Sequence, residues 1–95
     1  MNVIDIRESS ELCTEACWTA YDLALDKEVN ERLIRKLGEL GALLFLSGLK
    51  EPFYRIEGRL FMIKGLEGKK VLRVAMLIGE EHIVEKVKHI VETCG

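Results

Sequence analysis

Two cysteines are the residues whose spacing most directly suggests chemistry. Cys13 and Cys17 lie four positions apart in the stretch LCTEACWTAYDLAL, residues 12–25, so a helix would place them one turn apart on one face. A disulfide does not fit that geometry, because it needs Cβ atoms about 4 Å apart and one helical turn separates them by about 5 to 6 Å. A structural zinc site needs further ligands and more often has two residues between its cysteines. We therefore interpret both cysteines as small core residues.

The histidines and a glycine-rich turn are the other candidates for a site. His82 and His89 are seven positions apart, which is about 10 Å along a helix and too far for one metal ion. The stretch GLEGKK, residues 65–70, contains G-x-x-G, but it is predicted to join two strands, whereas the nucleic-acid clamp of that pattern joins two helices. The sequence has no hydrolase, metalloprotease, Walker A or dinucleotide-binding motif. We predict no catalytic residue, no metal site and no cofactor.

The charges are distributed unevenly along the chain. Residues 1–31 contain eight acids and two bases, residues 32–73 contain ten bases and four acids, and residues 74–95 contain four acids and two bases. The formal net charge of −2 therefore hides an acidic beginning and a basic middle. The sequence leaves open whether these two segments meet within one chain or between two chains.

The basic middle of the chain suggests nucleic-acid binding. Tyr54 and Phe61 are interleaved with basic residues on predicted strands, and such surfaces bind single strands through phosphate contacts and base stacking. The candidate residues are Arg55, Arg59, Lys69, Lys70 and Arg73. The pI of about 5.7 argues against this function, because domains that bind nucleic acid more often exceed a pI of 9. RNA or single-strand binding is therefore the alternative hypothesis.

Two helices are predicted in the first part of the chain. Ile4 and Ile6 fit one side of a short strand, but residues 9–25 have a broad apolar arc and only a narrow polar stripe at helical spacing. A second helix is predicted over residues 26–37, with Asp26 as its N-cap. The inner stripe of this second helix comprises Val29, Leu33, Leu37 and Leu40.

A third helix is predicted over residues 80–94, at the end of the chain. Its apolar residues recur at helical spacing and form one continuous face. These residues are Ile83, Val84, Val87, Ile90, Val91 and Cys94.

A β-meander is predicted between the second and third helices. The segments rich in β-branched, aromatic and leucine residues are 42–47, 53–64 and 71–78, and turn signals separate them. Gly58 either forms a bulge or belongs to a Glu57-Gly58 turn, so three to four strands are expected. The predicted fold class is α+β: residues 1–95 form a single domain with an antiparallel meander, two helices before it and one after it, all packed on the sheet.

Both faces of the predicted sheet are apolar over its middle. Met62 and Ile63, for example, would face opposite sides of the sheet. Because 95 residues are too few to cover both faces, we expect a homodimer that buries the second one. The predicted partner-binding residues are Trp18, Tyr21, Leu25, Phe45 and Phe61.

The function expected from the sequence is binding without catalysis. The chain would bind itself and a protein partner or small effector, and a third hypothesis is an enzyme subunit with a pocket between chains. Acidic residues interrupt the N-terminal segment, which argues against a signal peptide. The longest apolar run, residues 42–46, is far shorter than the roughly 20 residues that span a bilayer. We therefore expect a cytoplasmic protein with no membrane partner.

Overall fold

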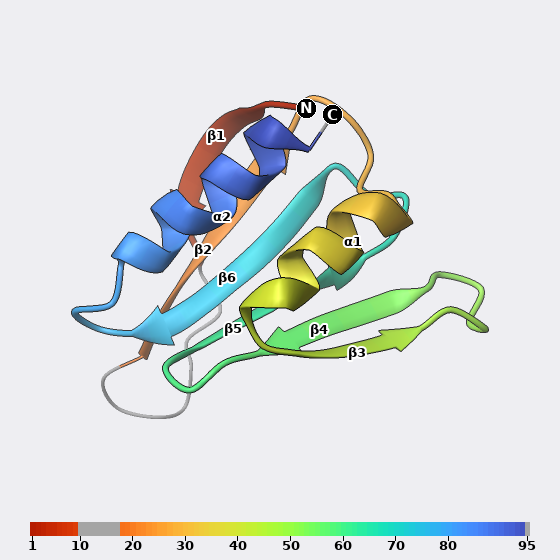
Figure 1. Ribbon diagram of the computed structural model, residues 1–95. Coiled ribbons are helices and arrows are strands. Elements are labelled where there is room, and N and C mark those ends of the chain that lie inside the picture. The colour runs from red at the N-terminus through yellow and green to blue at the C-terminus, as the bar shows by residue number, and fades with distance from the viewer. Residues whose placement is uncertain (10–17, 95) are drawn as a thin grey trace.

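The computed structural model describes residues 1–9 and 18–94, and this part of the chain contains one six-stranded antiparallel sheet (Figure 1). The strands, in chain order, are β1 (Val3–Glu8), β2 (Trp18–Leu25), β3 (Ala42–Leu46), β4 (Phe53–Glu57), β5 (Phe61–Leu66) and β6 (Val71–Leu77). Their order across the sheet is β1-β2-β6-β5-β4-β3. The helices are α1 (Glu31–Leu37), which continues into a 3₁₀ turn (Gly38–Leu40), and α2 (His82–Thr93).

The fold is α+β but the predicted architecture is wrong. We expected three to four strands with two helices before them and one after; instead, six strands and two α-helices are found in the described residues. Residues 18–25 of the predicted first helix form β2, in the interior of the sheet between β1 and β6. Residues 10–17, which include Cys13 and Cys17, lie outside the described residues, so the core-packing interpretation of these cysteines stays a prediction.

The meander from β3 to β6 contains four strands. β4 and β5 are separated by a turn over residues 58–60, in which the Gly58 N–H donates to the carbonyl of Phe61 at 2.9 Å. Gly58 therefore lies in a turn and not in a bulge. A Cβ at this position would lie 2.1 Å from the Phe61 ring, so only glycine lets that ring pack against the turn.

The helix α1 begins four residues later than predicted. Its N-cap is Asn30, whose Oδ1 accepts a hydrogen bond from the Leu33 N–H at 2.9 Å. Asp26, the predicted cap, instead accepts from the backbone N–H of Asn2 at 2.8 Å and so holds the start of the chain beside β2. Of the predicted inner stripe, Leu33 and Leu37 are confirmed as buried positions of α1, whereas Val29 is buried but precedes the helix and Leu40 is half-buried in the 3₁₀ turn.

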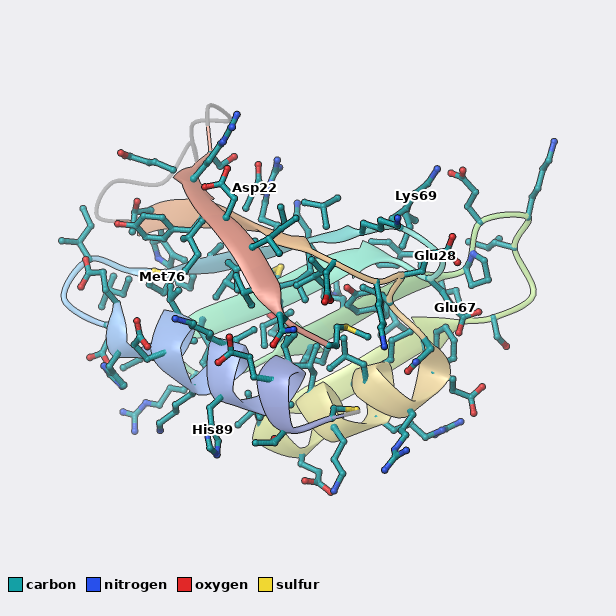
Figure 2. All side chains as sticks on the ribbon, turned by 90° about the horizontal axis from the view of Figure 1, so that it is seen from above. Asp22, Glu28, Glu67, Lys69, Met76 and His89 are labelled. Atoms are coloured by element: carbon teal, nitrogen blue, oxygen red, sulfur yellow. The ribbon has the colours of Figure 1, made fainter. Side chains whose placement is uncertain are left out.

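Both helices cover the same face of the sheet, which we call the inner face (Figures 1 and 2). The predicted apolar face of the last helix is confirmed: Ile90 is half-buried and the other five residues are buried. The core between helices and sheet includes Leu23, Leu25, Leu33, Ile34, Leu37, Tyr54, Ile56, Ile63, Leu72, Val74, Met76, Val87 and Val91. The opposite side, which we call the outer face, carries neither α1 nor α2.

Candidate outer-face binding site

The strand register determines which side chains share the outer face. Alternate residues of a strand face opposite sides, and the buried residues Leu72, Val74 and Met76 place every even position of β6 on the inner face. Arg73 therefore lies on the outer face, directly opposite Asp22 of β2 on one side and Lys64 of β5 on the other. The same row continues through all the remaining strands. From β1 to β3 it reads Arg7, Asp22, Arg73, Lys64, Arg55 and Leu44.

The first charged contact in this row is a two-point ion pair between Arg73 and Asp22. The Arg73 Nε donates to Asp22 Oδ1 at 2.8 Å, and Nη2 donates to Oδ2 at 3.3 Å. The two side chains are 24% and 33% exposed, so solvent screens this pair less than an ion pair at a fully exposed position. The acidic beginning and the basic middle of the chain therefore meet within one chain.

Lys64 lies between two other cations. In register it is directly opposite Arg73 on one side and Arg55 on the other, and side chains opposite each other have Cβ atoms about 4.5 to 5.5 Å apart. No residue within 1–9 or 18–94 forms an ion pair with Lys64 or Arg55. Like charges in directly opposite positions repel one another, and within the described residues Asp22 is the carboxylate that contacts a cation of this row.

An apolar row runs beside the charged one. It contains Ala24, Val71, Leu66, Phe53 and Leu46, in the order β2, β6, β5, β4 and β3. The two rows enclose an open hollow of about 400 Å³. Among the described residues its side-chain lining comes mainly from Asp22, Lys64, Lys69, Arg73, Phe53, Leu66 and Val71. Asp22 and Lys69 lie on the side of the sheet away from the helices, as Figure 2 shows.

Lys69 is held at the rim of this hollow by the turn between β5 and β6. The Lys69 carbonyl accepts from the Val29 N–H at 2.8 Å, and the Gly68 N–H donates to the Val29 carbonyl at 2.9 Å. Gly68 has φ +90°, a conformation that L side chains rarely adopt. The ammonium of Lys69 lies 3.2 Å from Glu51, and both side chains are more than half exposed. The turn thus positions a third cation near Lys64 and Arg73.

The predicted nucleic-acid-binding residues are only partly brought together. Arg55 and Arg73 lie in the charged row, and Lys69 lies at the rim with the exposed Lys70 beside it. Arg59 lies in the turn at the opposite end of β5. Lys64 and Asp22 are not among the predicted binding residues, although strict alternation along residues 61–66 and 71–77 places Lys64 and Arg73 on matching faces of the sheet.

The predicted partner-binding residues do not form one surface. Trp18 begins β2 opposite Leu77 and faces outward, whereas Tyr21 and Phe45 are half-buried against the core. Leu25 and Phe61 are buried in the core, with 1% and 9% of their surface exposed. A partner that binds the folded domain can therefore contact Trp18 on the outer face but not Leu25.

The structure brings together no metal-binding cluster in the residues it describes. No three His, Cys, Asp or Glu side chains in that part of the chain gather closely enough to hold an ion. His82 and His89 are both exposed, and Figure 2 shows His89 on the helix side of the sheet. His89 also lines a second open hollow beside α2, together with Leu40, Glu85, Lys86 and Ile90.

Comparisons with protein-family models, with curated proteins and with solved structures found no match. No helix in the described ranges is both long and apolar enough to cross a membrane.

Proposed function

We propose that this chain is a small binding domain whose outer face binds an anionic ligand with an apolar part. The observation that carries the proposal is the register of three cations, Arg55, Lys64 and Arg73, in directly opposite positions of neighbouring strands. Such neighbours repel one another, and an anionic group above Lys64 would turn that repulsion into attraction. Oxygen atoms of a sulfonate, phosphate or carboxylate would accept charge-assisted hydrogen bonds from Lys64.

The apolar row favours a ligand that is more than an inorganic anion. Phe53, Leu66 and Val71 line the hollow beside the cations, and Val71 is 45% exposed. Burial of an apolar ligand group against them would add about 25 cal/mol for each Å² removed from water. The volume of about 400 Å³ lies within the range typical of small-molecule sites.

The titratable groups of the hollow favour binding over catalysis. Asp22 is its one described carboxylate, and both oxygens of that group accept from Arg73. A general base needs a carboxylate oxygen within reach of a substrate proton, and both oxygens of Asp22 are already engaged by Arg73. Of the cations in the described lining, Arg73 contacts Asp22 and Lys69 lies 3.2 Å from Glu51, whereas Lys64 forms no ion pair with a described residue and suits recognition of an anion.

Single-stranded nucleic acid is the second candidate ligand. Phe53 on the outer face, next to Arg55 and Lys64, provides one surface on which a base could stack. Tyr54 and Phe61, which the sequence suggested for stacking, face the helices and are buried. A small anion therefore fits the outer face better than a strand of several stacked bases.

Calorimetric titration with a matched pair of probes tests the proposal. We expect naphthalene-1-sulfonate to bind and the neutral naphthalene-1-methanol to bind at least about tenfold more weakly, because the charge-assisted hydrogen bonds are lost. Lys64→Gln should weaken sulfonate binding by about tenfold to hundredfold. The control Lys36→Gln, at an exposed position of α1, removes the same charge far from the hollow and should have no effect.

Two outcomes contradict the proposal. Equal affinity for the charged and neutral probes would show that the cations do not select the ligand, and equal effects of Lys64→Gln and Lys36→Gln would place binding elsewhere. A single-stranded oligonucleotide serves as a third probe. Tighter binding of longer oligonucleotides, with a steep loss of affinity in salt, would favour the second candidate.

A further inference from the structure

The edge strand β3 has an unusual composition for its position. It pairs with β4 on one side, and no other described strand or helix pairs with its opposite side. Its sequence ALLFL contains no charge, no proline and no glycine. Leu44 and Leu46 are 39% and 43% exposed. A strand of this kind offers both unused backbone hydrogen-bonding groups and apolar side chains to another strand.

The opposite edge of the sheet is protected in the ways that edge strands usually are. β1 carries Asp5, Arg7 and Glu8, and Asp5 forms an ion pair with Arg7. Its pairing with β2 also shifts register between Val3 and Asp5, which disrupts the regular ladder. Charges and irregularities keep an edge from pairing with another chain. The two edges therefore differ, and only β3 is built to accept a further strand.

We infer that β3 pairs antiparallel with β3 of a second copy of this chain. A twofold axis beside Leu44 would place Leu44 of one copy opposite Leu44 of the other. By the same symmetry, Leu43 of each copy would lie opposite Phe45 of the other, and Ala42 opposite Leu46. All five pairs join apolar side chains. The two sheets would continue into one twelve-stranded sheet, closed by about four to six new backbone hydrogen bonds.

This arrangement covers surface that one chain leaves half-buried. Leu43 and Phe45 pack against the core from the inner face but stay partly exposed at the edge. The mate's Phe45 and Leu43 would complete their contacts, because directly opposite side chains lie about 4.5 to 5.5 Å apart. The outward residues Leu44 and Leu46 would gain apolar neighbours in the same way.

The charges near β3 permit self-pairing. Arg55 of β4 is the neighbour of Leu44 in register, so the two copies of Arg55 would be three strand spacings apart, about 14 Å. That distance exceeds the Debye length of about 8 Å at physiological ionic strength, so their repulsion is largely screened. A strand of a different protein would have to carry its own uncharged apolar sequence to pair with ALLFL, whereas β3 of a second copy carries that sequence already. The inference does not rest on the ligand proposed above.

A charge-swap experiment tests the pairing. We expect sedimentation equilibrium of the full chain to give a dimer of about twice 10.8 kDa. Leu44→Lys places two ammonium groups opposite each other and should weaken the dimer at least about tenfold, and Leu44→Glu should do the same with carboxylates. An equimolar mixture of the two variants should restore a dimer, because opposite charges then face each other. The control is Ile4→Lys, at a position that is 66% exposed on the other edge and should not affect assembly.

Each outcome supports or overturns the inference. A monomer at concentrations up to about 100 μM, or an unchanged dimer in both Leu44 variants, would overturn it. Monomerisation by Ile4→Lys would move the interface to β1. If the variants are monomeric but their mixture does not associate, pairing through position 44 is refuted and a general loss of stability is responsible. Thermal unfolding of each variant distinguishes that case.

Discussion

The buried hydroxyl of Tyr54 gives the sharpest test of the core. Tyr54 has no exposed surface, and its hydroxyl has no hydrogen-bond partner among the residues the structure describes. It lies over Gly65, its neighbour in register on β5, where a Cβ would be 2.5 Å from the hydroxyl oxygen. The hydroxyl thus occupies the space that the missing side chain leaves. Tyr54→Phe removes one polar atom and keeps the ring in place.

The expected effect of Tyr54→Phe is a gain in stability. A buried polar group without a partner costs about 1 to 3 kcal/mol in desolvation, and that cost disappears with the hydroxyl. The void left by one oxygen costs a few tenths of a kcal/mol by the usual relation with cavity volume. We therefore expect the free energy of unfolding to rise by about 1 kcal/mol and Tm by about 4 to 8 °C for a domain of this size.

The pH dependence of unfolding provides an independent readout. Burial raises the pKa of Tyr54 above its ordinary value of 10.0 because the folded state disfavours the phenolate. The pKa of Tyr54 is higher in the folded chain than in the unfolded chain. The free energy of unfolding is therefore unaffected by this ionisation below about pH 10 and falls as the pH rises further, because the unfolded chain loses the proton first. The wild-type chain should lose about 1.4 kcal/mol per pH unit there from this residue alone. Phenylalanine has no such ionisation, so the difference in free energy of unfolding in favour of Tyr54→Phe should grow as the pH rises above about 10.

Urea unfolding at pH 8 and pH 11 measures both effects. Tyr21→Phe is the matched control, because Tyr21 is half-buried and the same atom is removed next to solvent. A variant Tyr54→Phe that is less stable than wild type by 1 kcal/mol at pH 8 would mean that the hydroxyl has a partner. An advantage that does not grow between pH 8 and pH 11 would mean that solvent reaches the phenolate in the folded state.

Three further changes test other parts of the fold. Asn30→Ala removes the acceptor for the Leu33 N–H and should lower the free energy of unfolding by about 1 kcal/mol, whereas Asn30→Asp should retain most of it in urea titrations. Asp22→Asn should destabilise by about 1 kcal/mol at low salt, with a difference that shrinks as salt screens the cations; a constant difference would refute the role of repulsion. Gly65→Ala should cost more than about 2 kcal/mol because its Cβ would meet Tyr54, whereas Gly48→Ala, with nothing within 4 Å, should be tolerated in thermal melts.

The sequence predicted the last helix and the meander because each follows one clear period. Residues 83–94 repeat their apolar positions at helical spacing, and turn residues separate β3, β4, β5 and β6. Residues 18–25 follow no single period. Leu23 and Leu25 face the core and Ala20 and Ala24 face outward, and this interior strand therefore reads as apolar on both faces, like a buried helix. Its Trp, Thr and Tyr residues favour a strand, and this preference outweighs the helical spacing of its apolar residues.

The error in secondary structure also explains why the predicted partner-binding residues do not share one surface. On a helix, Trp18, Tyr21 and Leu25 share one flank, because their spacings are three and four residues. On a strand, positions 21 and 25 face one side and position 18 faces the other. The charged row was hidden for a related reason. The basic residues can be counted in the sequence, but only the pairing of β4, β5 and β6 makes Arg55, Lys64 and Arg73 neighbours.

The hollow on the outer face and the edge of β3 are separate in space, so ligand binding at one should not change the free energy of dimerisation at the other. If β3 pairs with its symmetry mate, the boundary of β5 and β6 lies about three strand spacings from the twofold axis, or about 14 Å. The two hollows would then be about 29 Å apart, and each would be complete within one chain. Ligand and second copy would share no side chain, since Leu44 and the hollow-lining residues do not overlap. We therefore expect the affinity of the wild-type chain for naphthalene-1-sulfonate to be the same at protein concentrations below and above the dissociation constant of the dimer, and a tenfold lower affinity of the monomer in calorimetry would show that the ligand site needs the dimer.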